Sequence, residues 1–175
     1  MKDKSLVLTV LLAAFAGSAL GQTRVSGTLK CGGKPAAEYT VEVGDYPGHV
    51  LIMNKDNGNS CTWPVPIEIA GVKTIGNIGA GFTEVDGAKL QIRGWDVQTM
   101  ENGDTVYVHT QGTGTVTEDG KAFTYEGTWS WTDGTGKFKG IKGKGTFKGS
   151  GTSDVGATSQ IEGEYTLPPA GASGK

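Results

Sequence analysis

The chain has 175 residues, with 16 lysines and arginines against 18 aspartates and glutamates and a formal net charge of −2. This near-neutral balance excludes a molecule built as a whole to attract nucleic acid, so we expect no nucleic-acid partner. The residues beyond the first 21 are enough for one ordinary domain with a buried core. None of them forms an apolar run long enough to span a membrane.

The first 21 residues have the pattern of a secretory signal peptide. Lys2 and Lys4 give a positive start, residues 6–16 are almost entirely apolar, and residues 19–21 place small residues at the −3 and −1 positions. A membrane anchor is the alternative, but it needs roughly 20 apolar residues. The sequence therefore predicts export to a secreted or periplasmic location, with no transmembrane anchor.

The exported part contains two cysteines, Cys31 and Cys61. In an oxidising compartment an isolated pair most simply forms a disulfide. A metal or redox pair is the alternative, but the chain has no C-x-x-C spacing and two histidines in all. We predict a structural disulfide within a domain over residues 22–167, followed by a flexible tail over residues 168–175.

The 30 glycines alternate with β-branched and aromatic residues, a pattern typical of short strands joined by tight turns. Asn-Gly and Asp-Gly pairs recur, and these accept the positive φ angles of hairpin turns. No later segment sustains helical periodicity, and the best place for a short helical turn is residues 72–75. The predicted strands are, in chain order, residues 25–30, 39–43, 49–54, 62–69, 79–85, 89–98, 105–117, 122–132, 145–151 and 159–167.

The strand pattern is clearest over residues 122–131. Alternate side chains of a strand point to opposite faces. One face here carries Phe123, Tyr125, Gly127, Trp129 and Trp131, and the other carries Ala122, Thr124, Glu126, Thr128 and Ser130. One buried and one wet face suit a closed antiparallel barrel, which removes sheet edges. We predict an all-β fold, a single small antiparallel β-barrel of about eight strands, with Trp129 and Trp131 inside.

Residues 127–152 are rich in glycine and lysine, and two other interpretations of them fail. A phosphate-binding loop would end in G-K-[ST] before a helix, and no such end or helix follows. A flexible linker would lack Phe138, Ile141 and Phe147. We predict a crossing segment over residues 138–142 and then a strand whose glycines make room for the two tryptophan rings.

The stretch TDGTGKFKGIKGKGTFKG, followed by EGEYTL, resembles the closing strands of the allene oxide cyclase-like and dirigent-like barrels. More closely, it resembles secreted bacterial proteins of unknown function placed near that group. The upstream pieces GHVLIMNKDNGNSCTW and IEIAGVKT are similar to the same bacterial set. The resemblance implies an eight-stranded antiparallel barrel with a central cavity. The catalytic positions of the cyclase have no residue-by-residue match, so none is carried over.

The candidate ligand-binding residues are aromatic or imidazole side chains of the predicted barrel. A packed core is the alternative role for the aromatic ones. They are Trp95, His109, Tyr125, Trp129 and Trp131.

His109 could act as a general base beside Glu84 or Glu126, but nothing in the spacing requires that meeting, and a surface or hydrogen-bonded histidine is the simpler interpretation. Two histidines make a metal site improbable, and residues 56–59 suit a hairpin turn better than a calcium loop. We expect no metal, no cofactor and no catalytic residue.

The lysines between residues 137 and 148 form a dense basic group and are the last candidate binding site in the sequence. It could bind polyanions, or it could serve as solvent-facing strand residues that keep the protein soluble. Its members are Lys137, Lys139, Lys142, Lys144 and Lys148.

The sequence thus favours an exported, non-enzymatic barrel that binds a small apolar or amphipathic ligand or serves as an envelope interaction module. The alternatives are a cavity-templated isomerase or cyclase, by fold analogy, and a polyanion-binding surface protein.

Overall fold

The computed structural model describes residues 22–32 and 35–169, which form an all-β domain with a single short 3₁₀ helix. The predicted signal peptide and residues 170–175 of the predicted tail lie outside the described residues. The strands are β1 (Thr23–Cys31), β2 (Ala37–Glu42), β3 (His49–Lys55), β4 (Cys61–Val65), β5 (Glu68–Ile69), β6 (Val72–Asp86), β7 (Lys89–Met100), β8 (Thr105–Val116), β9 (Ala122–Gly134), β10 (Lys142–Thr152) and β11 (Gly156–Thr166), and the 3₁₀ helix η1 spans Gly136–Phe138.

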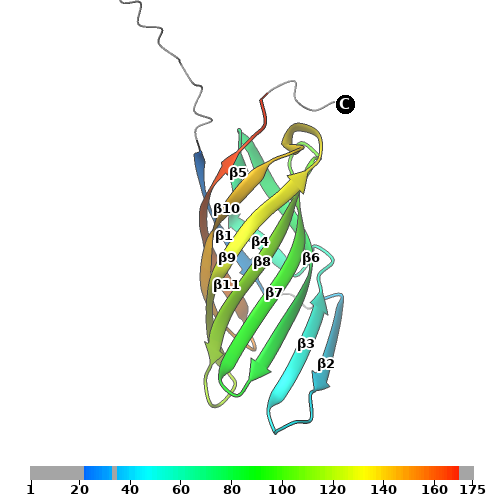
Figure 1. Ribbon diagram of the computed structural model, residues 1–175, viewed down its shortest axis with the longest axis vertical. Helices are drawn as coiled ribbons and strands as arrows, with labels where there is room; N and C mark the ends of the chain where they lie inside the picture. Colours follow the sequence, from blue (N-terminus) through cyan, green and yellow to red (C-terminus); the bar gives the residue numbers. More distant parts are fainter. Residues whose placement is uncertain (1–21, 33–34, 170–175) are drawn as a thin grey trace, which may run out of the picture.

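The strands form one antiparallel sheet in the order β2-β3-β6-β7-β8-β9-β10-β11-β1-β4, with β5 paired to β6 beside this path. The sheet curls into a half-barrel (Figure 1), which confirms the predicted all-β antiparallel fold. Eight strands, from β6 round to β4, make the curled part. The β2–β3 hairpin extends the sheet beyond β6, at the lower right of Figure 1. The predicted ring without edges is therefore wrong in this respect, because within residues 22–32 and 35–169 strand β2 pairs with β3 alone.

The segment after β3 joins the two sides of the half-barrel. Residues 62–69 were predicted to form one strand, but the structure divides them between β4, which pairs with β1, and β5, which pairs with β6. Pro66 lies between the two and has no backbone N–H to continue a ladder. Residues 72–75 begin strand β6 and do not form a helical turn.

Large rings on the inner face of the sheet pack against glycines of neighbouring strands. A Cβ on Gly145 would lie 2.6 Å from Cζ2 of Trp129, and one on Gly151 would lie 2.7 Å from Cζ of Phe123. A Cβ on Gly127 would likewise lie 2.6 Å from Cζ of Phe147. A side chain at any of these glycines would displace a ring or the backbone, so the glycines provide the room that the sequence predicted.

The core lies at the end of the half-barrel that β4 and β5 bridge. Trp129 and Trp131 face inward and are 4% and 2% exposed, as predicted. The indole N–H of Trp129 donates to the carbonyl of Glu162 at 3.1 Å. The other buried apolar residues at this end come from several strands and from η1, and they include Val25, Ile67, Ile69, Met100, Val106, Val108, Phe138, Ile141 and Tyr165.

The predicted disulfide is present between Cys31 and Cys61, whose Cα atoms are 4.0 Å apart. The two residues are also cross-strand partners of β1 and β4. The bond therefore fixes β4, the last strand of the curled part, to its neighbour. Within the described residues, no helix is long and apolar enough to cross a membrane.

A cluster of polar side chains holds the turn of the β2–β3 hairpin against β6. His49 Nδ1 lies 2.8 Å from a carboxylate oxygen of Asp45, and its Nε2 lies 3.0 Å from a carboxylate oxygen of Glu84 on β6. The ring of Tyr46 stacks on that of His49 at 5.1 Å between centroids. A hydrogen bond to Asp86 raises the pKa of the Tyr46 hydroxyl to about 12. We call Asp45, Tyr46, His49, Glu84 and Asp86 the hairpin clasp.

The inner-face tryptophans should be essential for stability, whereas an outer-face tryptophan should not. We expect Trp129→Ala to lower the free energy of unfolding by about 3–5 kcal/mol, because the ring is buried among neighbours that can collapse only in part. Trp95→Ala is the matched control, since that side chain is 56% exposed. Denaturant titration measures both changes, and equal losses would contradict the assigned faces.

The disulfide should stabilise the domain mainly by restricting the unfolded chain. The sequence separation of 30 residues corresponds to about 3–4 kcal/mol in the loop-entropy account. We expect the Cys31→Ala/Cys61→Ala double variant to lose about this amount in denaturant titration. A count of two free thiols in the unfolded, unreduced wild-type protein would show that the bond does not form.

The hairpin clasp should make stability depend on pH. The hydrogen bond from His49 to Asp45 raises the pKa of the imidazole above its usual 6.5, and the hydrogen bond to Glu84 makes a smaller contribution in the same direction. A raised folded-state pKa means that the stabilisation is complete below pH 6.5 and is lost as the pH rises through the folded-state value. We therefore expect wild type to exceed His49→Gln in melting temperature at pH 6, with the difference shrinking at higher pH.

The control for the clasp is Thr158→Val, an exposed position on β11 that removes no titratable group. Its melting-temperature difference from wild type should stay constant over the same pH range. A difference for His49→Gln that grows with pH would contradict the assigned role of the imidazolium.

Candidate functional site: the outer face of the sheet

The five candidate ligand residues lie on two opposite faces of the sheet. Tyr125, Trp129 and Trp131 point to the inner face, where Trp129 and Trp131 belong to the core. Trp95 and His109 are cross-strand partners on the outer face, with ring centroids 5.4 Å apart. The two groups thus lie on opposite faces of the sheet, although Trp129 also borders the hollow that His109 lines, where the facing residues of β10 and β11 are glycines.

The inner tyrosine is half-buried and already bonded within the sheet. Its hydroxyl lies 2.7 Å from Oγ of Ser159 on β11, and burial raises the pKa of the Tyr125 hydroxyl. A Cβ on Gly149 would lie 2.6 Å from the Tyr125 hydroxyl oxygen, so this ring also covers a glycine. These contacts give Tyr125 a packing role.

The two acidic residues considered as partners for His109 have other positions. Glu84 bonds to His49 in the hairpin clasp. Glu126 is the cross-strand partner of Thr113, whereas His109 is opposite Ser130. The acid–base pair that the sequence suggested for His109 is thus absent from the contacts of the described residues.

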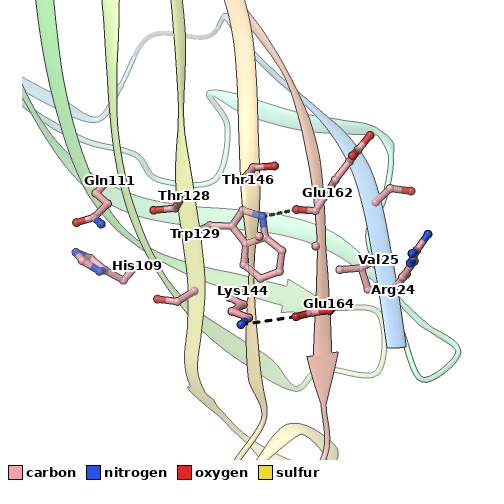
Figure 2. Close-up of a pocket in the computed structure, with 14 residues that line it drawn as sticks. Arg24, Val25, His109, Gln111, Thr128, Trp129, Lys144, Thr146, Glu162 and Glu164 are labelled. Atoms are coloured by element: carbon pink, nitrogen blue, oxygen red, sulfur yellow. Dashed lines mark hydrogen bonds and ion pairs between the residues drawn. The ribbon is translucent and has the colours of Figure 1, made fainter. Parts of the chain in front are cut away.

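The outer face of the sheet has a shallow groove across β8, β9, β10, β11 and β1, with a volume of about 960 Å³. Its lining includes the short hydroxyl side chains of Thr128, Ser130 and Thr146 together with apolar surface from Trp129 and Val25. Figure 2 shows His109 and Gln111 at one side of these hydroxyl side chains and Arg24 at the other. A second hollow of about 790 Å³ adjoins it toward β7 and shares Gln111, Thr128, Thr146 and Glu162. We call the two together the outer groove.

Strand register explains how distant segments build this groove. One row of cross-strand partners runs Gln111, Thr128, Thr146, Glu162 and Ser26, and the next runs His109, Ser130, Lys144, Glu164 and Arg24. The short side chains of Thr128, Ser130 and Thr146 lie among longer ones on the neighbouring strands, and this difference in size leaves a hollow. The sequence showed that Thr128 and Ser130 share the polar face of a strand, but it did not show which strands lie beside it.

The outer groove is nearly balanced in charge. Four basic and three acidic residues line it, namely Arg24, Arg93, Lys144 and Lys148 with Glu126, Glu162 and Glu164. Lys144 Nζ lies 3.7 Å from a carboxylate oxygen of Glu164. A balanced lining gives a weak net field and favours hydrogen bonding over attraction of a strongly charged ligand.

Other members of the lysine group are held by the protein's own carbonyls. Lys137 Nζ donates to the carbonyl of Ala70 at 2.8 Å, and Lys142 Nζ donates to the carbonyl of Thr132 at 2.6 Å. Lys139 lies beyond η1, outside the strand that carries Lys144 and Lys148. The group is therefore spread over a turn and a strand.

Asp56 and its neighbours form a turn. Asp56 Oδ1 accepts hydrogen bonds from the backbone N–H groups of Gly58 and Ser60, at 2.9 and 3.4 Å.

Across residues 22–32 and 35–169, no three or more His, Cys, Asp or Glu side chains gather in an arrangement that could hold a metal ion.

Comparison with solved structures gives likeness at the level of the fold. A conserved protein of unknown function from Rhodopseudomonas palustris has 10% sequence identity and a TM-score of 0.46, over 83% of this chain and 98% of the other. No family model matches the sequence, and no curated protein matches it.

Proposed function

We propose that this protein is an exported, non-enzymatic binding module that holds a neutral, hydroxyl-rich ligand, such as a segment of a glycan, in the outer groove. The observation that carries the proposal is a hollow of about 960 Å³ whose lining combines three hydroxyl side chains, apolar surface from Trp129, and side chains of both charges. That volume lies within the usual range of ligand sites.

The lining supplies the right hydrogen-bonding groups for such a ligand. A threonine or serine hydroxyl can donate and accept, as can each hydroxyl of a sugar. Arg24 donates, Glu162 accepts, and the Gln111 amide does both, so the two sides of the groove can bond to hydroxyls at different points along an extended ligand. The groove thus complements a ligand that alternates donors and acceptors.

Trp95 adds an exposed aromatic surface beside one end of the groove. Its ring is 56% exposed and lies next to His109, which lines the groove. An exposed indole offers an apolar face together with an N–H donor. The C–H face of a sugar ring can stack on such a surface while its hydroxyls reach the groove.

The charge balance of the outer groove supports a neutral ligand over a polyanion. Glu126, Glu162 and Glu164 lie among the basic side chains and would repel sulfate or phosphate groups. Packing of the inner rings on glycines supports a binding module over a cavity-templated isomerase, since these rings are engaged with the protein's own strands. The disulfide supports a location outside the reducing cytoplasm.

Calorimetric titration with neutral hexasaccharides of glucose and of N-acetylglucosamine tests the proposal, with heparin as the acidic comparison. We expect a neutral oligosaccharide to bind and the Thr128→Val/Thr146→Val variant to bind it roughly tenfold or more weakly, because two hydroxyl partners are lost. Thr158→Val is the matched control, since Thr158 lies on β11 and does not line the groove.

Two outcomes would reject the proposal. One is equal affinity in the groove variant and in Thr158→Val. The other is binding of heparin alone, abolished when Lys139, Lys142 and Lys144 are changed to glutamine, which would favour the polyanion-binding function.

A further inference from the structure

We propose that the free edge of β2 binds an extended peptide segment of alternating basic and apolar residues, which adds to the sheet as a further antiparallel strand. This surface lies on the hairpin, away from the residues of the outer groove. The inference is independent of the proposed glycan ligand.

The backbone of β2 has hydrogen-bonding groups available for a partner. β2 is the first strand of the sheet, and among the described residues its one neighbour is β3. The N–H of Val43 donates to the carbonyl of His49 at 2.9 Å, and ladder bonds alternate along an antiparallel pair. The odd-numbered residues of β2 therefore bond to β3, while the N–H and C=O groups of Glu38, Thr40 and Glu42 point to the free edge.

The edge lacks most of the features that prevent strand addition, and the charges that it does carry are all acidic. Natural sheets protect their edges with charged side chains, above all lysine, and with proline, a bulge or a covering segment. Strand β2, with the sequence AEYTVE, contains neither lysine nor proline, and its register with β3 runs without a shift from Ala37 to Glu42. The strand is thus straight enough to template a partner over its whole length.

The side chains of β2 specify the chemistry of that partner. On one face, Glu38 and Glu42 are exposed and acidic. On the other, Tyr39 and Val41 are 64% and 49% exposed. An added strand gains most when it places basic residues opposite the two glutamates and apolar residues opposite Tyr39 and Val41, because cross-strand pairs of these kinds stabilise a sheet.

The apolar face of β2 continues across the hairpin. Tyr39 is the cross-strand partner of Met53, which is 46% exposed, and Met53 is the partner of Phe82 on β6. Apolar side chains of an added strand would extend this row by one more member. The row therefore gives the partner an apolar surface as well as backbone bonds.

A second copy of the chain fits this edge less well. In the symmetric antiparallel register centred on Thr40, Glu38 of one copy lies opposite Glu42 of the other. Like charges directly opposite each other are destabilising. The acidic pair thus favours a basic partner over self-association.

The hairpin clasp keeps the edge in a binding-ready position. His49 joins the hairpin turn to Glu84 on β6 at 3.0 Å, so β2 and β3 are fixed to the rest of the sheet. A strand that is already ordered pays less conformational entropy when a peptide adds to it. β-Strand addition to an exposed sheet edge is an established mode of peptide recognition.

Fluorescence anisotropy of a labelled peptide, acetyl-GKVTVKG-amide, tests the inference with the whole exported chain. We expect saturable binding to wild type and at least tenfold weaker binding to Thr40→Pro. Proline at position 40 removes an N–H that faces the edge and leaves the ladder with β3 intact. Thr40→Val is the matched control and should bind as wild type does.

A charge exchange provides a second test that does not depend on proline. The Glu38→Lys/Glu42→Lys variant should lose affinity for the basic peptide at least tenfold and gain affinity for acetyl-GEVTVEG-amide. Thermal melting of each variant verifies that it remains folded.

Three results would overturn the inference. The first is equal binding of the basic peptide by Thr40→Pro and wild type, and the second is equal affinity of wild type for the basic and acidic peptides. The third is a concentration-dependent dimer in sedimentation that Thr40→Pro abolishes, because a second copy would then occupy the edge.

Discussion

The packing of large rings onto glycines of neighbouring strands is the interaction on which the rest of this structure depends. Trp129, Phe123 and Phe147 each lie where a side chain on the facing glycine could not fit. Glycine in a strand is normally a cost in entropy and in lost packing. Here each ring restores the missing contact area, and the absent side chains let the sheet curl tightly around the rings.

This arrangement separates the two faces of the sheet into different roles. The inner face is occupied by its own side chains, with Trp131 and Phe138 deeply buried at the bridged end. Both proposed binding surfaces accordingly lie away from the inner face, one on the outer face and one at the β2 edge. The short hydroxyl residues of the outer groove sit directly between the inward-pointing rings on β9, so a single alternating strand serves both the core and the proposed site.

Two local interactions, a disulfide and a hydrogen-bonded cluster, fix strands at the two margins of the sheet. The disulfide fixes β4 to β1, and the hairpin clasp fixes the β2–β3 hairpin to β6. Together they give the half-barrel rigid margins without closing the sheet into a full ring. An open edge is a liability for aggregation unless it is used or protected. The acidic, unprotected β2 edge is explained if strand addition is part of the protein's activity.

The sequence by itself determined the all-β class, most strand positions, the cysteine pair and the inward direction of Trp129 and Trp131. Each of these follows from local alternation, turn residues or residue type. Tertiary structure alone decided that the sheet stays open at β2, that Trp95 and Tyr125 lie on opposite faces, and that Thr128 and Thr146 share a groove with Arg24. Those outcomes depend on which strands become neighbours and in what register, and a period of two along one strand carries no information about the strand beside it.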